Sequence, residues 1–472
     1  MLTMDITKLS PAGVWRNFSE ICAIPHASGN EKQLSCFLAE KAEKMGFLVR
    51  QDEFYNLRID RKTVLPDSPR ILLQGHLDMV PQAAPGKVFD FEKDPVTPVI
   101  REDFIYADGT TLGADDGIGV SIALAALADE NIKGNLSAVF TVNEETGLIG
   151  AGKLSPDFLE GDILINLDHG DSSKVCIGCA GGVRLAFDFA TGEQEAPAGR
   201  SVEITLSGLP GGHSGSCIHQ KRGNALQMLA RIVKDLPVSI SSFNGGTVDN
   251  AIPDSAVISC ILTSEDAADE LFRRAEEMKK ELETRFTLEL DIKLIPSPEK
   301  VWAADFQKKF LEVFSTLPNG VVDFASEYGV PRTSSNLASL KNTPGNLHLI
   351  LSARSLDDKK RKIHTDDLIS LLSVLEPQVK INSEYPGWTP DTASTLPETV
   401  VRLRKELLGK DTEIEVIHAG LEAGIFAGKN PRLQMVSISP DSFDIHTANE
   451  HVSISSVQEF YTFFAAFLNK LV

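Results

Sequence analysis

The sequence contains no apolar segment long enough to cross a lipid bilayer, and its first 20 residues lack the apolar core of a signal peptide. It also contains few cysteines, six among 472 residues, which is too few for the disulfide framework of a secreted protein and is typical of a reducing cytoplasm. Cys176 and Cys179 form one C-x-x-C pair, but the second pair that a zinc ribbon requires is missing. These absences predict a cytoplasmic protein with no membrane partner.

Basic residues are also scarce. Lys and Arg number 46 against 66 Asp and Glu, so the formal net charge is −20. A nucleic-acid-binding protein needs a basic face that neutralises phosphates, so we expect no nucleic-acid partner. The excess of acid is otherwise explained by a solvated surface that keeps the protein in solution.

The first part of the chain alternates between helical and strand-like patterns. Apolar runs at 71–73, 138–142 and 163–167 indicate buried strands, and a helical pattern at 118–128 lies between two of them. Such alternation predicts an α/β fold with a mixed, largely parallel sheet and helices on both of its faces.

The pattern changes after Gly182. A strand–turn–strand pattern at 246–262 precedes a charged helix at 266–284, and a strand-like stretch at 333–355 precedes a helix at 359–375. The proline-containing run 384–390 indicates a hinge. After it, helical and strand patterns resume. We therefore expect one discontinuous α/β domain, formed by 1–184 and 388–472, interrupted by an inserted α+β domain at 185–387.

Residues that can bind metal follow the three strands predicted above and a fourth apolar run at 436–438, which leads through a loop to His446. The carboxyl ends of strands in an open α/β sheet form the ligand crevice. Alternate residues of an extended segment share a face, so His76 and Asp78 can point the same way. Adjacent carboxylates such as Glu144 and Glu145 repel each other unless a cation lies beside them. The residues at these strand ends are His76, Asp78, Glu144, Glu145, Asp168 and His446.

A further acidic pair, Asp115-Asp116, directly precedes the predicted helix, whose positive dipole end favours carboxylates. Imidazole and carboxylate ligands suit zinc, with cobalt or manganese as possible substitutes. Two divalent ions would balance the three carboxylates of Asp115, Glu145 and Asp168 together with one hydroxide. The sequence therefore predicts a pair of divalent ions, which would act as Lewis acids and generate the hydroxide.

Several motifs with their order and spacing identify a family resemblance that runs from about Ser10 to the C-terminus. The chain resembles the dinuclear zinc peptidases of the aminoacylase and carboxypeptidase G clan, and within it the aminoacyl-histidine dipeptidases, also called peptidase D or cytosol non-specific dipeptidase. The motifs that carry the resemblance are His76-Leu77-Asp78, Gly113-Ala114-Asp115-Asp116-Gly117, Glu144-Glu145-Thr146-Gly147, Asn166-Leu167-Asp168, Gly211-Gly212-His213-Ser214-Gly215, Asn250-Ala251-Ile252-Pro253 and His418-Ala419-Gly420-Leu421-Glu422.

The resemblance implies a role for each residue of the catalytic domain. Asp115 would bridge both metals, and a cis peptide would follow it. His76 and Asp168 would complete the protein ligands of one ion, and Glu145 and His446 those of the other. Glu144 would be the general base that activates a hydroxide bridging the ions, and Asp78 would orient His76. The substrate would be a dipeptide, of the Xaa-His type or of broad specificity.

The resemblance also implies that the inserted domain is a lid that forms a homodimer. His213 would stabilise the oxyanion, reaching a neighbouring subunit's site. A dipeptidase must recognise the free C-terminal carboxylate of its small peptide substrate, and an Arg fork matches a carboxylate. Arg354 is the best cation for this role, with Asn250 as a second donor, although a surface salt bridge from Arg354 to Asp357 or Asp358 is an alternative. By resemblance, Gly420 would line the same pocket.

The chain departs from the family pattern at three places. Asn143 stands where the family usually has Asp, Asp116 stands where it usually has Asn, and His169 begins a stretch that is commonly acidic. None of these departures removes an expected ligand, and His169 is an alternative ligand itself.

Other functions remain as alternatives. An aminoacylase, deacylase or carboxypeptidase of the same clan is the main rival, and a catalytically inactive binding relative is a second. A dinucleotide-binding oxidoreductase is a third. Its glycine motif is incomplete here because Ile122 replaces the third glycine, and two acids stand where a pyrophosphate would bind.

Overall fold

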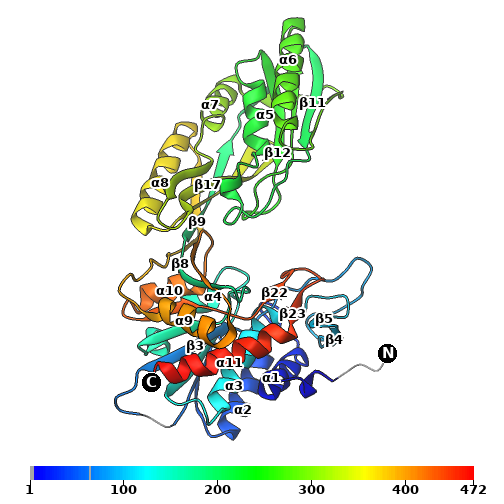
Figure 1. Ribbon diagram of the computed structural model, residues 1–472. Coiled ribbons are helices and arrows are strands. Elements are labelled where there is room, and N and C mark those ends of the chain that lie inside the picture. The colour runs from blue at the N-terminus through cyan, green and yellow to red at the C-terminus, as the bar shows by residue number, and fades with distance from the viewer. Residues whose placement is uncertain (1–4, 63–64) are drawn as a thin grey trace. The chain divides into compact units, whose positions relative to one another are not determined.

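The computed structural model describes residues 5–62 and 65–472, and these divide into two compact units. Unit 1 comprises Met1–Cys179, Trp388–Val416 and Leu421–Val472, and unit 2 comprises Ala180–Gly387 and Ile417–Gly420. In Figure 1 unit 1 therefore combines blue and cyan elements with orange and red ones, whereas unit 2 is mainly green and yellow. Unit 2 includes Ile417–Gly420, a segment that the sequence analysis assigned to the first domain, because Ala180 N donates to the carbonyl oxygens of Ile417 and Ala419.

Unit 1 is built on an eight-stranded mixed sheet. Its centre is parallel, since β3 pairs in parallel with β6 and β7, and β7 pairs in parallel with β21. The flanking pairs β1–β2, β2–β6 and β21–β8 are antiparallel. In sheet order the strands are β1 (Leu48–Gln51), β2 (Leu57–Asp60), β6 (Asn135–Thr141), β3 (Arg70–His76), β7 (Ile163–Asn166), β21 (Gln434–Ser437), β8 (Lys174–Cys179) and β20 (Glu413–Ile417).

Helices cover both faces of this sheet, as the alternating pattern predicts. Ile71 and Leu73 of β3 belong to a hydrophobic cluster that includes apolar residues of α1, α2, α3, α9 and α11. On the other face α10 packs against α4 and η2. The helices are α1 (Ala12–Cys22), α2 (Lys32–Lys44), α3 (Ala114–Ala128), α4 (Ile149–Lys153), η2 (Pro156–Leu159), α9 (Leu396–Leu408), α10 (Glu422–Lys429) and α11 (Ile454–Lys470).

A small four-stranded sheet also belongs to unit 1. Its strand order is β22 (Ser442–Phe443), β23 (His451–Ser453), β5 (Phe104–Ala107) and β4 (Pro98–Arg101). The loop between β22 and β23 contains His446, so this small sheet anchors the loop that follows β21 of the main sheet.

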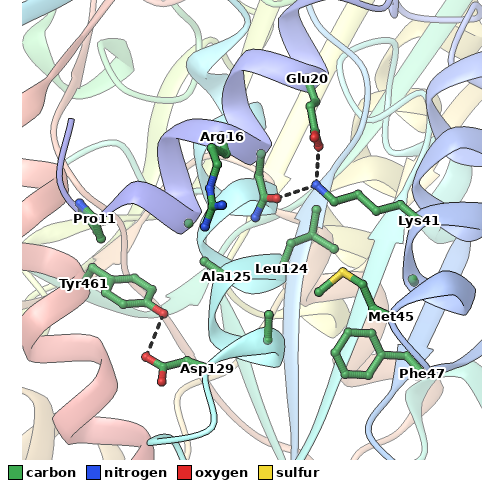
Figure 2. Close-up of a pocket in the computed structure, with 14 residues that line it drawn as sticks. Pro11, Arg16, Glu20, Lys41, Met45, Phe47, Leu124, Ala125, Asp129 and Tyr461 are labelled. Atoms are coloured by element: carbon green, nitrogen blue, oxygen red, sulfur yellow. Dashed lines mark hydrogen bonds and ion pairs between the residues drawn. The ribbon is translucent and has the colours of Figure 1, made fainter. Parts of the chain in front are cut away.

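A cavity of ≈ 470 Å³ lies among α1, α2 and α3, and Figure 2 shows its lining. Lys41 contacts both Glu20 and Asn17, and the Tyr461 hydroxyl donates to Asp129 over 3.4 Å. The charged groups of this cavity are therefore largely paired with neighbours in its own wall. Its described lining residues include none of the predicted metal ligands.

Unit 2 is an α+β structure in which a nine-stranded antiparallel sheet carries helices over one hydrophobic face. Its strands along the sheet are β14 (Glu289–Leu294), β11 (Arg200–Ser207), β13 (Ala256–Leu262), β12 (Val238–Gly245), β17 (Val330–Thr343), β18 (Asn346–Ser355), β9 (Gly181–Ala190) and β19 (Gln378–Tyr385), with β16 (Gly320–Ala325) paired to β17. A two-stranded sheet pairs β10 (Glu193–Glu195) with β15 (Lys300–Trp302). The helices are α5 (Ala225–Val233), α6 (Glu265–Glu283), α7 (Ala304–Phe314) and α8 (Asp358–Leu372).

The two faces of this sheet differ in chemistry because side chains alternate along each strand. Leu185 and Leu351 point into the hydrophobic cluster under the helices. The intervening residues Arg184, Ser352 and Arg354 line a different, polar cavity. No helix in the described part of the chain is long and apolar enough to cross a membrane.

Candidate active site

Parallel strands of unit 1 bring several predicted site residues to one edge of the sheet. His76 is the last residue of β3, Glu144 and Glu145 follow β6, and Asp168 follows β7. Because β6, β3 and β7 are parallel neighbours, their carboxyl ends meet at this edge. Asp115 reaches the same place from the start of α3.

Asp115 lies between two histidines. Its Oδ1 is 3.2 Å from His76 Nε2, and its Oδ2 is 3.2 Å from His446 Nε2. Glu145 Oε1 is 3.0 Å from His446 Nε2, and Asp168 Oδ2 is 3.9 Å from His76 Nε2. The five residues thus form two groups, His76–Asp115–Asp168 and Asp115–Glu145–His446, that share the Asp115 carboxylate.

The backbone at Asp115 is irregular. Gly113 has a φ of 71°, and Asp115 and Asp116 have non-helical dihedral angles at the start of α3. The peptide between Asp115 and Asp116 is cis, as the family resemblance implies. A Cβ at position 113 would lie 3.0 Å from Met79 Sδ, so glycine suits both the backbone angle and the space there.

Asp78 links His76 to the acidic pair after β6. Its Oδ1 is 3.5 Å from His76 Nδ1 and accepts the Glu144 backbone N–H at 2.9 Å. Its Oδ2 accepts the Glu145 N–H at 3.2 Å and the Ser28 hydroxyl at 2.8 Å. Burial raises the pKa of Asp78, but His76 and these donors more than offset it, so the pKa lies below its ordinary value. His76 Nδ1 lies closer to the backbone carbonyl oxygen of Asp78, at 3.0 Å, so Asp78 positions the histidine through its backbone as well as its carboxylate, and the two glutamates through the carboxylate.

Glu144 also lies close to His76, within a group that includes Glu145. Burial first, and then the nearby carboxylates of Glu145, Glu422 and Asp115, raise the pKa of Glu144 well above its ordinary value, although His76 opposes the shift. Burial and the neighbouring Asp115 likewise raise the pKa of Asp168. The site thus concentrates negative charge in a buried place.

Divalent cations fit this arrangement. Among the described residues, no Lys or Arg forms an ion pair with Asp115, Glu144, Glu145 or Asp168. Buried carboxylates without a cation are costly, so their charge calls for compensation from a bound ion. Two imidazoles and three carboxylates supply a donor set that suits zinc.

Each of the three residues that depart from the family pattern is accommodated by its neighbours in the structure. Asn143 has a φ of 54°, a left-handed conformation that Asn tolerates well, and its side chain accepts the Thr146 hydroxyl at 2.9 Å. Asp116 is buried between Gly75 and Gly119, where an added Cβ would lie 2.2 Å from its carboxylate oxygens. His169 Nε2 lies 3.1 Å from Glu415 Oε1 and is absent from the described metal-ligand groups.

Arg354 and Asn250, both in unit 2, line the same small cavity. Arg354 is the next-to-last residue of β18, and its Nη1 donates to the Tyr385 hydroxyl at 2.8 Å. Among the described residues it makes no ion pair with Asp357, which caps α8, or with Asp358, which lies 3.3 Å from Arg361. The surface salt bridge considered for Arg354 is therefore wrong.

Gly420, also in unit 2, lies against Tyr385. A Cβ at position 420 would lie 2.6 Å from the Tyr385 ring. The neighbouring His418 lies with its Nε2 2.7 Å from the Ser334 hydroxyl, and burial together with Arg354 lowers its pKa to about 3. Sequence analysis missed Tyr385 and Ser334 as site residues, and it quoted His418 only within a motif. Tyr385 stands in the proline-containing run that marked the hinge, which is the one signal that could have drawn attention to it.

His213 lies in the loop after β11. Its Nδ1 accepts the backbone N–H groups of Gly215 at 3.2 Å and Ser216 at 3.3 Å. An acceptor Nδ1 assigns the proton of a neutral imidazole to Nε2, which is then a donor. The loop is held further because Arg222 Nη1 donates to the carbonyl of Gly211 at 2.9 Å.

Comparison with known proteins agrees with the motifs. The chain is 36% identical over 482 residues to the cytosol non-specific dipeptidase of Escherichia coli strain K12, covering 99% of both chains. The crystal structure of aminoacylhistidine dipeptidase from Vibrio alginolyticus matches with a TM-score of 0.88 and 34% identity, over 99% of this chain and 98% of the other. Aminopeptidase PepT from Bacillus cereus, 16% identical over 98% of this chain and 99% of the other, shares the fold with a TM-score of 0.57.

A family model adds independent support for the resemblance that the motifs indicate. It matches residues 72–470, a span that contains all five predicted metal ligands and most of both units. The recognition of the family from sequence is therefore confirmed. The chain belongs to peptidase family M20/M25/M40.

Proposed function

We propose that this chain is a dipeptidase whose two divalent cations are held by His76, Asp115, Glu145, Asp168 and His446. The observation that carries the proposal is the Asp115 carboxylate, whose two oxygens each lie 3.2 Å from a different histidine nitrogen. One carboxylate shared by two ligand groups is the arrangement that a dinuclear centre requires. The relatives from Escherichia coli and Vibrio alginolyticus are both named as dipeptidases, which supports the same substrate class.

The cations, when bound, would polarise the scissile carbonyl and lower the pKa of a water molecule. His76 and Asp168 would hold one ion, and Glu145 and His446 the other, with Asp115 shared. We take zinc as the metal because of the His and carboxylate donors, with cobalt or manganese as substitutes.

Glu144 would act as the general base. It is adjacent to the ligand Glu145 but lies outside the two ligand groups that share Asp115. A partly buried carboxylate beside the ligand Glu145 is placed to take a proton from water and then give it to the leaving amine. Asp78 would keep His76 in the orientation that binding requires.

Residues of unit 2 would read the substrate's free carboxylate and the developing oxyanion. Arg354, oriented by Tyr385, would form charge-assisted bonds with the carboxylate, with Asn250 as a second donor and Gly420 beside them. His213 would donate from Nε2 to the oxyanion of a neighbouring subunit's site, so unit 2 would be both a lid and a dimerisation domain. The name of the Escherichia coli relative supports a cytosolic location.

Metal removal and a substrate panel test the proposal. Dialysis against a chelator should abolish hydrolysis of dipeptides, including β-Ala-His, and zinc, cobalt or manganese should restore it. Tripeptides are the control substrates for a peptidase of broader specificity. N-acyl amino acids are the control substrates for an acylase. Full dipeptidase activity in protein shown by elemental analysis to be metal-free would refute the dinuclear mechanism, and a preference for N-acyl amino acids would make the chain an acylase.

A further inference from the structure

Glu450 is a buried carboxylate that binds four consecutive backbone N–H groups. Its Oε2 accepts from Leu112 at 2.8 Å and Gly113 at 3.1 Å. Its Oε1 accepts from Ala114 at 2.8 Å and Asp115 at 3.1 Å. The residue is 2% exposed, so all four donors find their acceptor away from water. An unpaired buried N–H group is costly, so these four bonds hold the segment in place.

The bonds from Glu450 connect two segments that are far apart in the sequence. It ends the loop between β22 and β23, and that loop also contains His446. The Glu450 N–H donates to the carbonyl of Thr447 at 3.1 Å, which fixes the loop onto itself one residue after His446. A single side chain thus joins the segment that ends in Asp115 to the segment that begins with His446.

These two residues need such a link more than the other predicted ligands do. His76 ends a central strand, and Asp168 and Glu145 follow neighbouring strands by two and four residues. Asp115, in contrast, precedes the regular part of α3, and His446 is a loop residue with a φ of 63°. Their separation of 3.2 Å therefore depends on how two irregular segments are held together.

We propose that Glu450 is a positioning residue that sets the geometry of the Asp115–Glu145–His446 group and thereby the affinity of the second cation. The proposal rests on the dinuclear site described above and adds a residue that contacts neither metal. Only a carboxylate can accept from all four donors at once. A glutamine amide would present its own N–H₂ to two of the backbone N–H groups, so two of the four bonds would be lost and replaced by repulsion.

Replacement Glu450→Gln should weaken binding of the second cation by ~10–100-fold, the usual effect of removing a group that orients a metal ligand. Binding of the first cation should weaken less, because that cation shares Asp115 but its other two ligands, His76 and Asp168, belong to strand ends that Glu450 does not bond. Zinc stoichiometry at buffered free metal and a cobalt titration followed by absorption give the two affinities separately. Hydrogen exchange of the backbone amides of 112–115 in the metal-free protein should become faster in the variant.

Asp103→Asn is the matched control. Asp103 also accepts a backbone N–H, from Ser455 at 3.1 Å, and it lies beside the same small sheet, but it contacts neither ligand segment. It should leave both cation affinities and the exchange of 112–115 unchanged. If Glu450→Gln does not fold, Glu450→Asp replaces it, since the shorter carboxylate retains the charge but cannot reach both pairs of donors.

The outcomes separate the two proposals. A wild-type protein that binds fewer than two cations would refute the dinuclear centre itself. If the wild-type protein binds two and the Glu450 variant binds both with unchanged affinities, Glu450 has no positioning role. Equal weakening of both cations would also overturn the proposal, since it would show general loosening of unit 1.

Discussion

Glu144 and Glu145 are adjacent in sequence but have different neighbours, and this difference separates a proposed base from a proposed ligand. Glu145 Oε1 lies 3.0 Å from the His446 nitrogen, whereas Glu144 belongs to no group that includes Asp115. Glu144→Gln should therefore lower kcat by ~10²–10⁴-fold, the usual contribution of general acid–base catalysis, while both cations remain bound. Steady-state kinetics and elemental analysis of the same sample measure both properties.

Glu145→Gln is the matched comparison, because it removes the same charge one residue away. It should lose cation affinity as well as activity. Loss of metal from the Glu144 variant with retention in the Glu145 variant would mean that the two roles are exchanged. Near-native turnover of Glu144→Gln would exclude Glu144 as the base.

Within the described ranges 5–62 and 65–472 Arg354 forms no ion pair, and this makes it the residue to test for recognition of the substrate carboxylate. Arg354→Ala should lower kcat/KM for a free dipeptide by ~10–100-fold, since a hydrogen bond to a charged group contributes about 1.5–3 kcal/mol. The loss should nearly disappear for a dipeptide amidated at its C-terminus. Arg184 lines the same cavity but is paired with Asp249, so Arg184→Ala is a suitable control that should affect both substrates equally. An equal proportional loss on both substrates for Arg354→Ala would show that Arg354 binds something else.

Site residues that directly follow a strand could be predicted from the sequence. Residues that reach the site only through contacts with distant parts of the chain could not. His76 and Asp168 could be placed at one sheet edge because their apolar runs are visible in the sequence. Tyr385 and Glu450 could not be found this way. Tyr385 matters through a bond to a strand 31 residues away, and Glu450 through bonds to a loop 335 to 338 residues away. No local pattern of residues encodes either contact.

At the scale of elements, the short segment Ile417–Gly420 belongs to unit 2 although the residues on both sides of it belong to unit 1. Gly420 allows this segment to lie against Tyr385, which in turn bonds to Arg354. Gly420→Ala would place a Cβ 2.6 Å from the ring, so the ring and the guanidinium must shift. We expect kcat/KM for free dipeptides to fall by ~10-fold or more, because small misplacements of binding groups are costly.

Gly152→Ala is the control for this change. Gly152 lies in α4, and a Cβ there would meet nothing within 4 Å, so activity should be unchanged. Kinetics on free and amidated dipeptides would distinguish a carboxylate effect from general damage. Wild-type kcat/KM in Gly420→Ala would show that the position of Tyr385 does not influence substrate binding.

Element boundaries in the helical regions follow closely from the sequence pattern, whereas pairing in the sheets does not. The predicted helix at 266–284 is observed as Glu265–Glu283, and that at 359–375 as Asp358–Leu372 followed by the short 3-10 helix Ser373–Leu375. The stretch 333–355, in contrast, is two long antiparallel strands, β17 and β18. The place of β21 between β7 and β8 also depends on contacts between residues separated by more than 250 positions, which no periodicity reveals.

At the scale of the whole molecule, the proposed trans role of His213 predicts complementation between two inactive variants. Glu144→Gln and His213→Ala homodimers should both be nearly inactive. After subunit exchange half of the dimers are mixed, and one of the two sites in each mixed dimer has both native residues, so about one quarter of wild-type activity should return. Activity assays before and after exchange, with exchange verified by mass spectrometry, measure this recovery.

Two results would contradict the trans role. One is no recovery despite verified exchange, and the other is full activity in a protein that sedimentation shows to be monomeric. His219→Ala serves as a control, since His219 is an exposed histidine of the same region. The His219→Ala variant should be active without a partner variant, so mixing should restore nothing.

The order in which the ribosome makes the chain has a consequence for when this peptidase can first act. Unit 2 is almost complete at Gly387, but the main sheet of unit 1 lacks β21 until residue 437 has been made, and His446 comes later still. At ~5–20 residues per second, the roughly 250 residues between β8 and β21 take about 13–50 seconds to synthesise. The nascent chain thus carries an incomplete unit 1 while unit 2 is almost complete, and the five predicted ligands are together only after His446 has been made. By this arrangement the peptidase stays inactive until the ribosome has passed residue 446.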